Sequence, residues 1–127
     1  MNILIAEDNE IQQRILSAFF NQHLKIKPFI KENGQVALDF IKHNKNKKLD
    51  LIFTDFRMPV MNGMEFCKEL RKTDQLTPII LMTAQYEGFI NNQYDGIINE
   101  ILMKPYRLDS LATIISRYCN SIDYPMK

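Results

Sequence analysis

Short apolar runs alternate along the chain with longer stretches in which apolar residues recur at a helical period. The five runs cover residues 3–6, 28–30, 51–54, 79–82 and 101–103. Runs this short, bounded by polar residues, are typical of strands buried on both faces of a parallel sheet. Strands that alternate with helices favour a sheet wound by crossover helices. The pattern therefore predicts an α/β domain.

Helices are predicted in the stretches that follow the strands. Asn9 is expected to cap the first one. The others are predicted over residues 35–43, 63–72, 85–96 and 108–119. The side chains expected to face the core are Ile11, Ile15, Ala18, Phe19, Val36, Leu38, Phe40, Ile41, Met64, Cys67, Leu70, Leu108, Leu111, Ile115 and Tyr118. The helix over 85–96 is the weakest prediction, because Gly88, Asn91 and Asn92 are poor helix formers.

Five strands and five helices in alternation predict one doubly wound (βα)5 flavodoxin-like domain with strand order 2-1-3-4-5. The domain is expected to cover residues 1–120, with 121–127 as a C-terminal tail. In this order the first and third strands are neighbours. Ligands of such sheets bind at the carboxyl ends of the strands, where the strand order reverses.

Composition argues against binding to nucleic acid or a membrane and indicates where in the cell the protein is expected. The chain has 127 residues, and its 16 basic and 15 acidic residues leave a net charge of +1, so no global field favours direct binding to nucleic acid or a membrane. The sequence has no secretory signal and no run long enough to span a membrane. We therefore expect a cytoplasmic protein in which Cys67 and Cys119 are reduced, with a disulfide as the weaker alternative.

Three carboxylates follow two of the predicted strands. Glu7 and Asp8 follow the first run, and Asp55 follows the third. At ~4 Å and an effective dielectric of about 20, each pair of such charges repels by roughly 4 kcal/mol, so a cation is expected among them. Few carboxylates, with room for water and a phosphoryl oxygen, favour Mg²⁺. A single acid at a strand end is more often a helix cap or a solvated turn, but three at matching ends favour a site.

The same sheet edge is predicted to carry a hydroxyl and an ammonium group. Thr83 follows the fourth run and Lys104 follows the fifth. Acids, a hydroxyl and an ammonium together indicate phosphate chemistry, in which an aspartate attacks a phosphoryl group and Lys104 and Thr83 stabilise the transferred oxygens. Asp55 is the expected nucleophile, because it has no adjacent carboxylate.

Four short motifs resemble the receiver domains of two-component response regulators. In order they are Ala6-Glu7-Asp8-Asn9, the loop from Asp55 to Gly63, Thr83-Ala84 and Lys104-Pro105. The resemblance implies that Asp55 accepts a phosphoryl group from a phosphohistidine of a sensor kinase or phosphotransfer protein. It also implies Mg²⁺ bound by Asp8, Asp55 and the backbone carbonyl of Arg57, with Glu7 acting mostly through water, and a cis peptide between Lys104 and Pro105.

The resemblance further implies a switch that acts on no separate substrate. Phosphorylation would alter the surface formed by residues 85–96, 101–103 and 108–119, where a downstream protein or a second copy would bind. Receiver domains usually carry an aromatic residue three positions before the lysine, and here that residue is Ile101. Ile101 is expected to be strand core. Tyr106 is expected at the surface, with a contribution to the output surface as the alternative.

Two other functional classes are consistent with parts of the sequence. The first is a receiver fold that binds proteins without phosphorylation, which the missing aromatic residue favours. The second is an aspartyl-phosphate phosphohydrolase, which the residue two positions after Asp55 disfavours, because Arg57 stands where such enzymes carry a general acid. Met1 directly precedes the first strand, which favours a natural amino terminus.

Overall fold

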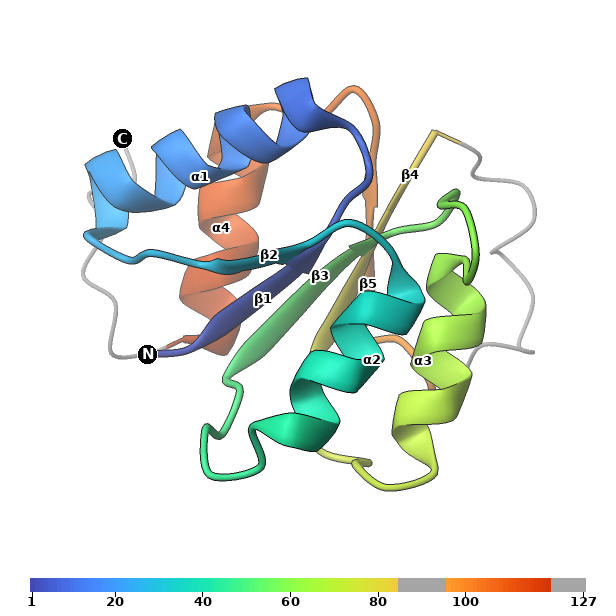
Figure 1. Cartoon of the computed structure of the whole chain (residues 1–127). Helices are drawn as coiled ribbons and strands as arrows, with labels where there is room; N and C mark the ends of the chain where they lie inside the picture. The colour runs from blue at the N-terminus through green and yellow to red at the C-terminus, as the bar shows by residue number, and fades with distance from the viewer. Residues whose placement is uncertain (85–95, 120–127) are drawn as a thin grey trace.

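A five-stranded parallel sheet forms the centre of the computed structural model, which describes residues 1–84 and 96–119 (Figure 1). The strand order is β2-β1-β3-β4-β5. The strands are β1 (Ile3–Ala6), β2 (Phe29–Lys31), β3 (Leu51–Asp55), β4 (Ile79–Thr83) and β5 (Glu100–Met103). The predicted α/β fold and strand order are confirmed, with strand boundaries shifted by one residue at most.

In the described residues, two helices cover each face of the sheet. The helices are α1 (Glu10–Leu24), α2 (Gly34–His43), α3 (Gly63–Arg71) and α4 (Leu108–Tyr118). Helices α1 and α4 lie on one face, and α2 and α3 lie on the other (Figure 1). The helix predicted over 85–96 falls almost wholly on residues 85–95, which lie outside the described residues, as does the tail over 121–127.

Alternate residues of each strand pack into two separate cores. Ile3 and Ile5 of β1 contact the side chains of α1 and α4, whereas Leu4 and Ala6 contact those of α2 and α3. This follows from the two-residue period of a strand, which directs successive side chains to opposite faces. A sheet covered on both sides is built mainly from apolar residues, and for this reason the strands appear in the sequence as short, largely apolar runs.

The predicted core face of α1 is wrong except at Phe19. Ile11 and Ile15 are 66% and 43% exposed, and Ala18 is exposed too. The buried residues are Leu16, Phe19 and Phe20. Two apolar stripes about 100° apart run along this helix, and the stripe that carries a second phenylalanine faces the sheet. The other stripe therefore lies at the surface.

The other predicted core faces are largely confirmed. Met64, Cys67, Leu70, Leu38, Leu111 and Ile115 are buried, and Val36, Phe40, Ile41 and Tyr118 are half-buried. Leu108 is the exception at 44% exposure, because it is the first residue of α4 and lies where the chain arrives from the sheet edge. Both cysteines are free and buried, so the alternative of a disulfide is wrong.

No helix in residues 1–84 or 96–119 combines the length and the apolar character that crossing a membrane requires.

Val60 has a strained backbone in the loop between β3 and α3. Its φ is 71°, a left-handed value that a β-branched side chain rarely adopts, and the N–H of Met61 donates to the carbonyl of Pro59 at 2.8 Å across it. The side chain is 80% exposed and contributes little packing. We expect Val60→Gly to raise the free energy of unfolding by about 1 kcal/mol, measured by urea denaturation.

Val60→Ala is the matched control for this prediction. Alanine keeps the Cβ that disfavours a left-handed backbone, so its gain should be smaller than that of glycine. A glycine variant less stable than the wild type would show that the turn is not strained.

Candidate functional site

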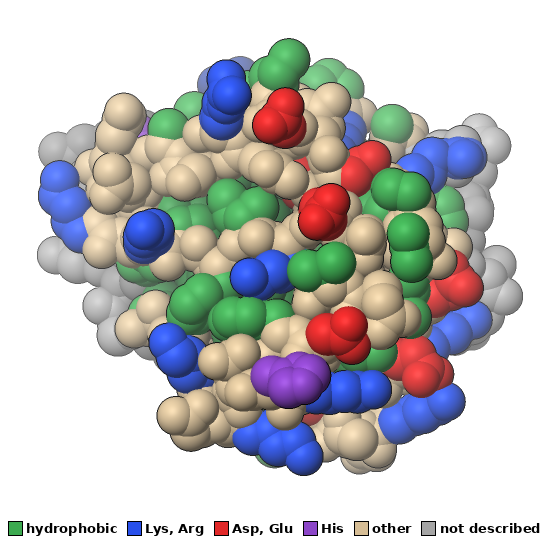
Figure 2. All heavy atoms as spheres, viewed as in Figure 1, with side chains coloured by type: hydrophobic (Ala, Val, Ile, Leu, Met, Phe, Trp, Pro, Cys, Tyr) green, Lys and Arg blue, Asp and Glu red, His purple; other side chains and the backbone are tan. Residues whose placement is uncertain are grey.

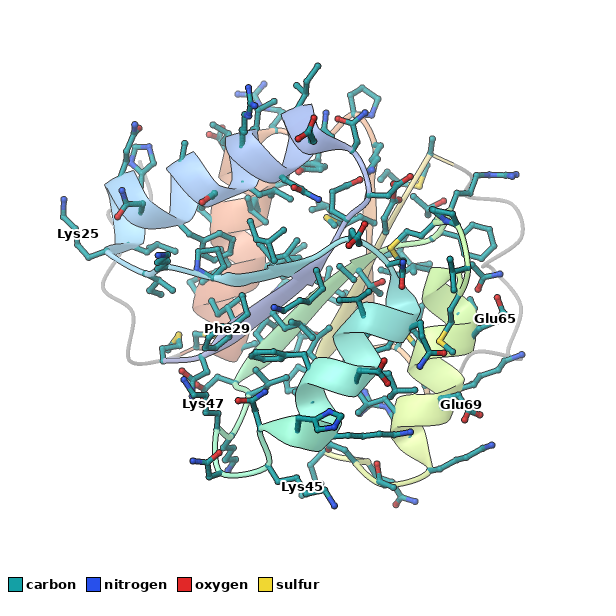
Figure 3. The ribbon with its side chains drawn as sticks, viewed as in Figure 1. Lys25, Phe29, Lys45, Lys47, Glu65 and Glu69 are labelled. Atoms are coloured by element: carbon teal, nitrogen blue, oxygen red, sulfur yellow. The ribbon has the colours of Figure 1, made fainter. Side chains whose placement is uncertain are left out.

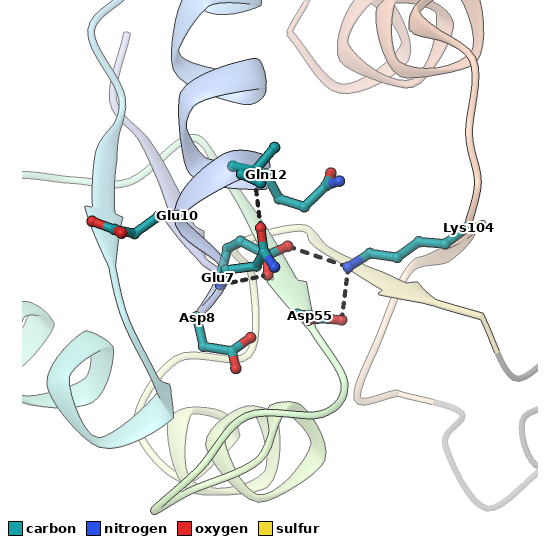
Figure 4. A pocket seen from close by; sticks show the side chains of 8 residues that line it. Glu7, Asp8, Glu10, Gln12, Asp55 and Lys104 are labelled. Carbon is teal, nitrogen blue, oxygen red and sulfur yellow. Dashed lines mark hydrogen bonds and ion pairs between the residues drawn. The ribbon is translucent and has the colours of Figure 1, made fainter.

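Three carboxylates meet at the carboxyl ends of β1 and β3. These strands are neighbours, and Ala6 pairs with Thr54, so the chain places Glu7 beside Asp55. Carboxylate oxygens of Glu7, Asp8 and Asp55 lie within 4.8 Å of one another. Figure 4 shows the three side chains converging from the two strand ends. The predicted acidic cluster is therefore present in the fold.

Lys104 reaches this cluster from the end of β5. Its Nζ lies 3.2 Å from Glu7 Oε1 and 3.2 Å from Asp55 Oδ1 (Figure 4). Its backbone N–H donates to the carbonyl of Thr83 at 2.8 Å, which fixes the strand end that carries it. The peptide bond between Lys104 and Pro105 is cis, as the resemblance implies. One ammonium group thus lies between two of the three acids.

Glu7 and Asp8 differ in their surroundings although they are adjacent in sequence. Glu7 is 1% exposed, and its Oε2 accepts from the backbone N–H of Asn9 at 3.2 Å. Gln13 Nε2 donates to the carbonyl of Glu7 at 2.6 Å. Asp8 is exposed, and within the described part of the chain its carboxylate makes neither a hydrogen bond nor an ion pair. Asp8 therefore remains available to a ligand, while Glu7 is already held by the protein.

Burial raises the pKa of Glu7, and the neighbouring Asp55 raises it further, while Lys104 only partly opposes them. The folded protein therefore binds a proton at Glu7 more readily than the unfolded chain does. The stability that this group contributes is present at low pH and is lost as the pH rises above 4.5, the ordinary value for a glutamate. At neutral pH, ionised Glu7 destabilises the metal-free fold.

Glu7→Gln should therefore stabilise the metal-free protein at pH 7. Glutamine can still accept from the N–H of Asn9 but does not ionise. The gain in unfolding free energy should shrink as the pH falls toward 4.5, because the raised pKa of Glu7 means that the folded wild type takes up this proton above the ordinary value. Urea denaturation in the presence of EDTA at several pH values measures this, and a gain that does not change with pH would contradict the assignment.

Two cavities adjoin the acids. The first, about 640 Å³, opens between the acidic cluster and the first turn of α1, and its lining comprises Glu7, Asp8, Asn9, Glu10, Ile11, Gln12, Asp55 and Lys104 (Figure 4). The second, about 620 Å³, is lined by Asp8, Phe56, Arg57, Met58, Pro59 and Asn62. Asp8 borders both cavities, and Arg57 lies in the second. A ligand in this region is therefore surrounded by the residues that the sequence singled out.

The donor set fits a hard divalent cation. When all three acids are ionised, Lys104 balances only one of their charges, and the carboxylate of Asp8 has no partner within the described residues. Carboxylate oxygens beside an open, solvent-filled cavity are the ligands from which Mg²⁺ sites are built, since this ion retains several waters. The chemistry of the residues present therefore agrees with the predicted metal.

Thr83 lies at the same sheet edge as the acids. It is 3% exposed and pairs with Met103, the residue before Lys104, while Asp55 pairs with Met82. Thr83 lines neither acidic cavity, although Ala84 and Lys104 line a third cavity nearby. Two site residues were not predicted from the sequence: Gln12, which lines the first cavity, and Gln13, which donates to the carbonyl of Glu7. Both lie in the first turns of α1, and their position soon after Glu7 and Asp8 is the feature of the sequence that could have indicated them.

Tyr106 is not the surface residue expected from the sequence. Its ring packs against the core formed by α1 and α4, and its hydroxyl is buried with no hydrogen-bond partner in the described part of the chain. Burial raises the pKa of Tyr106 to about 12, and the charges of Glu7 and Asp55 contribute to the rise. The ring is therefore partly buried against core residues that are distant from it in the sequence.

Known proteins are similar to this chain in sequence and in fold. A family profile, the response regulator receiver domain, matches residues 3–116. The osmolarity two-component system protein SSK1 of Saccharomyces cerevisiae is 42% identical over 97 residues, covering 76% of this chain and 12% of that protein. Hybrid signal transduction histidine kinase G of Dictyostelium discoideum is 33% identical over 123 residues, covering 93% of this chain and 4% of that protein. The chain thus spans a small part of these relatives.

A solved structure gives the same result. A chain in the co-crystal structure of the Saccharomyces cerevisiae histidine phosphotransfer protein Ypd1 with the receiver domain of Ssk1 has a TM-score of 0.79 and 30% identity, covering 93% of this chain and 88% of that chain. The receiver domain of the Pseudomonas aeruginosa sensor kinase PA1611, with magnesium in its active site cleft, has a TM-score of 0.76 and 26% identity over 94% of this chain and 98% of that one.

Proposed function

Because the chain belongs to the response regulator receiver domains of two-component signalling, we propose that it is a switch operated by phosphorylation of Asp55. The observation that carries this proposal is the meeting of Glu7, Asp8, Asp55 and Lys104 at one sheet edge beside an open cavity. The phosphoryl donor would be a phosphohistidine on a sensor kinase or a phosphotransfer protein. The protein would act on no separate substrate.

Each group of the site has a distinct part in phosphoryl transfer. A carboxylate oxygen of Asp55 forms a bond to phosphorus while the bond from phosphorus to the imidazole nitrogen of the donor breaks, which leaves an acyl phosphate and a free histidine. Lys104 already lies 3.2 Å from Asp55 and would offset the charge of the transferred oxygens. Mg²⁺, held by Asp8, Asp55 and the carbonyl of Arg57, would supply further positive charge to those oxygens.

Phosphorylation would change the balance of contacts at Lys104. The acyl phosphate adds about −1.5 to −2 charges and three acceptor oxygens beside an ammonium group that is also bound to Glu7. Thr83 and the backbone of Ala84 would move toward the new oxygens. The displacement would reach β5, α4 and residues 85–96, where we place the binding surface for a downstream protein or a second copy.

Ile101 favours a second candidate function, a receiver that binds partners without phosphorylation. This residue is half-buried against Met64 and Leu81 and carries no aromatic ring to relay a movement of Thr83. Partner binding that is unchanged in an Asp55→Asn variant and unaffected by a phosphodonor would support this candidate over the switch.

The experiment that tests the proposal is phosphorylation by a small donor. The chain is incubated with acetyl phosphate and either Mg²⁺ or EDTA, and its intact mass is measured. A phosphoryl adduct that forms with Mg²⁺ and not with EDTA is expected. The absence of any adduct with Mg²⁺ would overturn the proposal.

The two free, buried cysteines support a cytoplasmic location, where thiols stay reduced.

A phosphohistidine protein would approach across an apolar rim beside the acids. Ile15, Pro105, Tyr106 and Leu108 line a third cavity of about 420 Å³ next to Lys104, and Ile11 is 66% exposed at the edge of the acidic cavity. We expect Ile15→Asp to slow phosphoryl transfer from a phosphorylated partner protein by about tenfold or more, because the variant would place a charge where the partner covers an apolar side chain. Transfer from acetyl phosphate, which needs no protein interface, should stay at the wild-type rate. An equal loss with both donors would place the effect at Asp55 and not at the rim.

A further inference from the structure

Positive charge is concentrated in one part of the chain. Residues 25–48 contain seven lysines and only two acids, a net charge of +5, whereas the whole chain carries +1. The remainder of the chain therefore carries −4, including the acids of the phosphorylation site. This segment comprises β2, α2 and the loop after α2. A near-neutral protein thus presents one strongly basic region.

The lysines of this region form no salt bridge with the described residues. They are Lys25, Lys27, Lys31, Lys42, Lys45, Lys47 and Lys48. All are exposed except the half-buried Lys31, and in the described part of the chain none of them lies within 4 Å of a carboxylate. Figure 2 shows lysine and arginine side chains spread over the face that carries β2 and α2, and Figure 3 labels Lys25, Lys45 and Lys47 around it. Most of this positive charge is therefore left without a close carboxylate partner among the described residues.

Two aromatic rings hold lysines in place on this face. Phe29 of β2 and Phe40 of α2 lie 4.9 Å apart between ring centroids. The ammonium group of Lys31 lies 4.3 Å above the Phe40 ring, and that of Lys47 lies 5.2 Å above the Phe29 ring. Such cation–π contacts orient an ammonium group without removing its charge. Two of the seven charges are therefore held in fixed positions next to β2.

Strand β2 has an open edge beside these charges. Among residues 1–84 and 96–119 it is the terminal strand of the sheet and pairs only with β1. The carbonyl of Lys31 accepts from the N–H of Glu7 at 2.9 Å, so Lys31 faces β1. Because backbone groups of successive residues alternate in a parallel ladder, those of Ile30 face the open edge. The edge can therefore bond to an extended chain lying alongside it.

We propose that this basic edge, defined as β2 with the seven lysines of residues 25–48, binds an acidic extended segment of a partner protein. The segment would add beside β2 through backbone hydrogen bonds, and its carboxylates would lie against the lysines. This surface is separate from the phosphorylation site, and binding to it does not depend on Asp55.

Other anionic partners fit this surface less well. Single-stranded nucleic acid binds by stacking bases on open aromatic faces, but lysines cover the rings of Phe29 and Phe40. A membrane surface is bound most firmly when apolar side chains insert below the headgroups. The large exposed apolar residues in the described part of the chain are Met1, Ile11, Ile15, Val60, Leu76 and Leu108, all outside residues 25–48.

The test uses a blocked peptide of alternating glutamate and valine, titrated into the ¹⁵N-labelled full chain and followed by NMR. The amide signals of Phe29, Ile30 and Lys31 are expected to shift in a saturable manner, and binding should weaken as salt is added. An alternating lysine–valine peptide should produce no shifts. Shifts confined to other strands, or no saturable shifts at all, would overturn the proposal.

Charge-reversal variants identify the surface. The triple variant Lys25→Glu, Lys27→Glu, Lys47→Glu should weaken peptide affinity by about tenfold or more. The control variant Arg14→Glu, Lys68→Glu, Lys72→Glu makes the same change in net charge at exposed positions on and beside α1 and α3, and it should retain most of the affinity. Equal losses of peptide affinity in both variants would show that binding depends on net charge and not on this surface, and would overturn the proposal.

Two further measurements separate this inference from other outcomes. An oligothymidylate that binds the same residues more tightly than the acidic peptide would assign the surface to nucleic acid instead. Asp55→Asn should bind the peptide with wild-type affinity. Loss of phosphorylation therefore leaves this inference standing, and failure to bind the peptide leaves the proposed switch standing.

Discussion

Asp55→Asn is expected to abolish the Mg²⁺-dependent phosphoryl adduct that the wild-type chain forms with acetyl phosphate. The amide nitrogen and oxygen of asparagine cannot form the acyl phosphate, and the change also removes one of the three clustered carboxylates. Asp8 lies close to the same cavities, but it has no lysine within ion-pair distance among the described residues. Asp55 ends β3 and lies 3.2 Å from Lys104, so it is the acid of the site that we expect to accept the phosphoryl group.

The readout is intact mass after incubation with the donor and Mg²⁺. Asp39→Asn is the matched control, because Asp39 is an exposed acid on α2 whose carboxylate accepts a hydrogen bond from Gln35 at 3.0 Å and lies outside the acidic cluster. This variant should form the adduct to the wild-type extent. Retention of the adduct in Asp55→Asn would move the nucleophile to another acid. A thermal melt separates loss of chemistry from loss of fold, and Asp55→Asn should melt no lower than the wild type, because charge repulsion is relieved.

Gly63→Ala is expected to destabilise the fold by about 3 kcal/mol and to impair phosphorylation in the fraction that remains folded. A Cβ at Gly63 would overlap the carbonyl oxygen of Asp55 and lie 3.0 Å from its carbonyl carbon and 3.1 Å from Cα of Phe56. These are backbone atoms of the strand end that carries the nucleophile, so they cannot rotate away as a side chain would.

Hydrogen bonds also hold the start of the helix at Gly63, so the helix cannot easily shift away from β3. Asn62 and Glu65 cap it reciprocally, with hydrogen bonds of 2.9 and 3.0 Å, and the N–H of Gly63 donates to the carbonyl of Phe56 at 2.8 Å. Alanine is the better helix former, so helix propensity by itself would predict a gain. The clash of the added Cβ with the backbone of Asp55 outweighs this gain, so we expect a loss of stability.

Urea denaturation measures this effect, with Lys68→Ala as the control. Lys68 is exposed on the same helix, and its replacement should change the unfolding free energy by no more than about 0.5 kcal/mol. A Gly63→Ala variant as stable as Lys68→Ala would show that α3 can shift away from β3. The acetyl phosphate assay on the same sample then reports whether Asp55 remains in place.

Prediction from sequence succeeded where one local pattern had one structural solution. The run before Glu7 is wholly apolar and the run before Asp55 is apolar except for Thr54, and every residue of both runs is buried, as in a strand covered on both faces. Asn9 is the cap of α1, with its side chain accepting from the N–H of Gln12 at 3.0 Å. Strand order placed the first and third strands together, and the acids met there for that reason.

Prediction failed where two local solutions were nearly equal. Helix α1 carries two apolar stripes, and the side that faces the sheet depends on which side chains fill the space left by β1 and α4. Leu16 and Phe20 occupy that space, and Ile11 and Ile15 are left at the surface beside the acidic cavity. Tyr106 is a similar case, because its burial depends on a gap between elements that are distant in sequence.

The sequence by itself determined the strands and the strand ends that carry the acids, Thr83 and Lys104, because strand periodicity and chain direction are local properties. The strand order was expected from the doubly wound topology that alternating strands and helices favour. Only the tertiary structure decided how those acids divide. Glu7 became a buried partner of Lys104, and Asp8 stayed exposed and open to a cation. Adjacent residues with the same charge cannot be distinguished along the chain, since burial and the reach of a lysine 97 positions away exist only after folding.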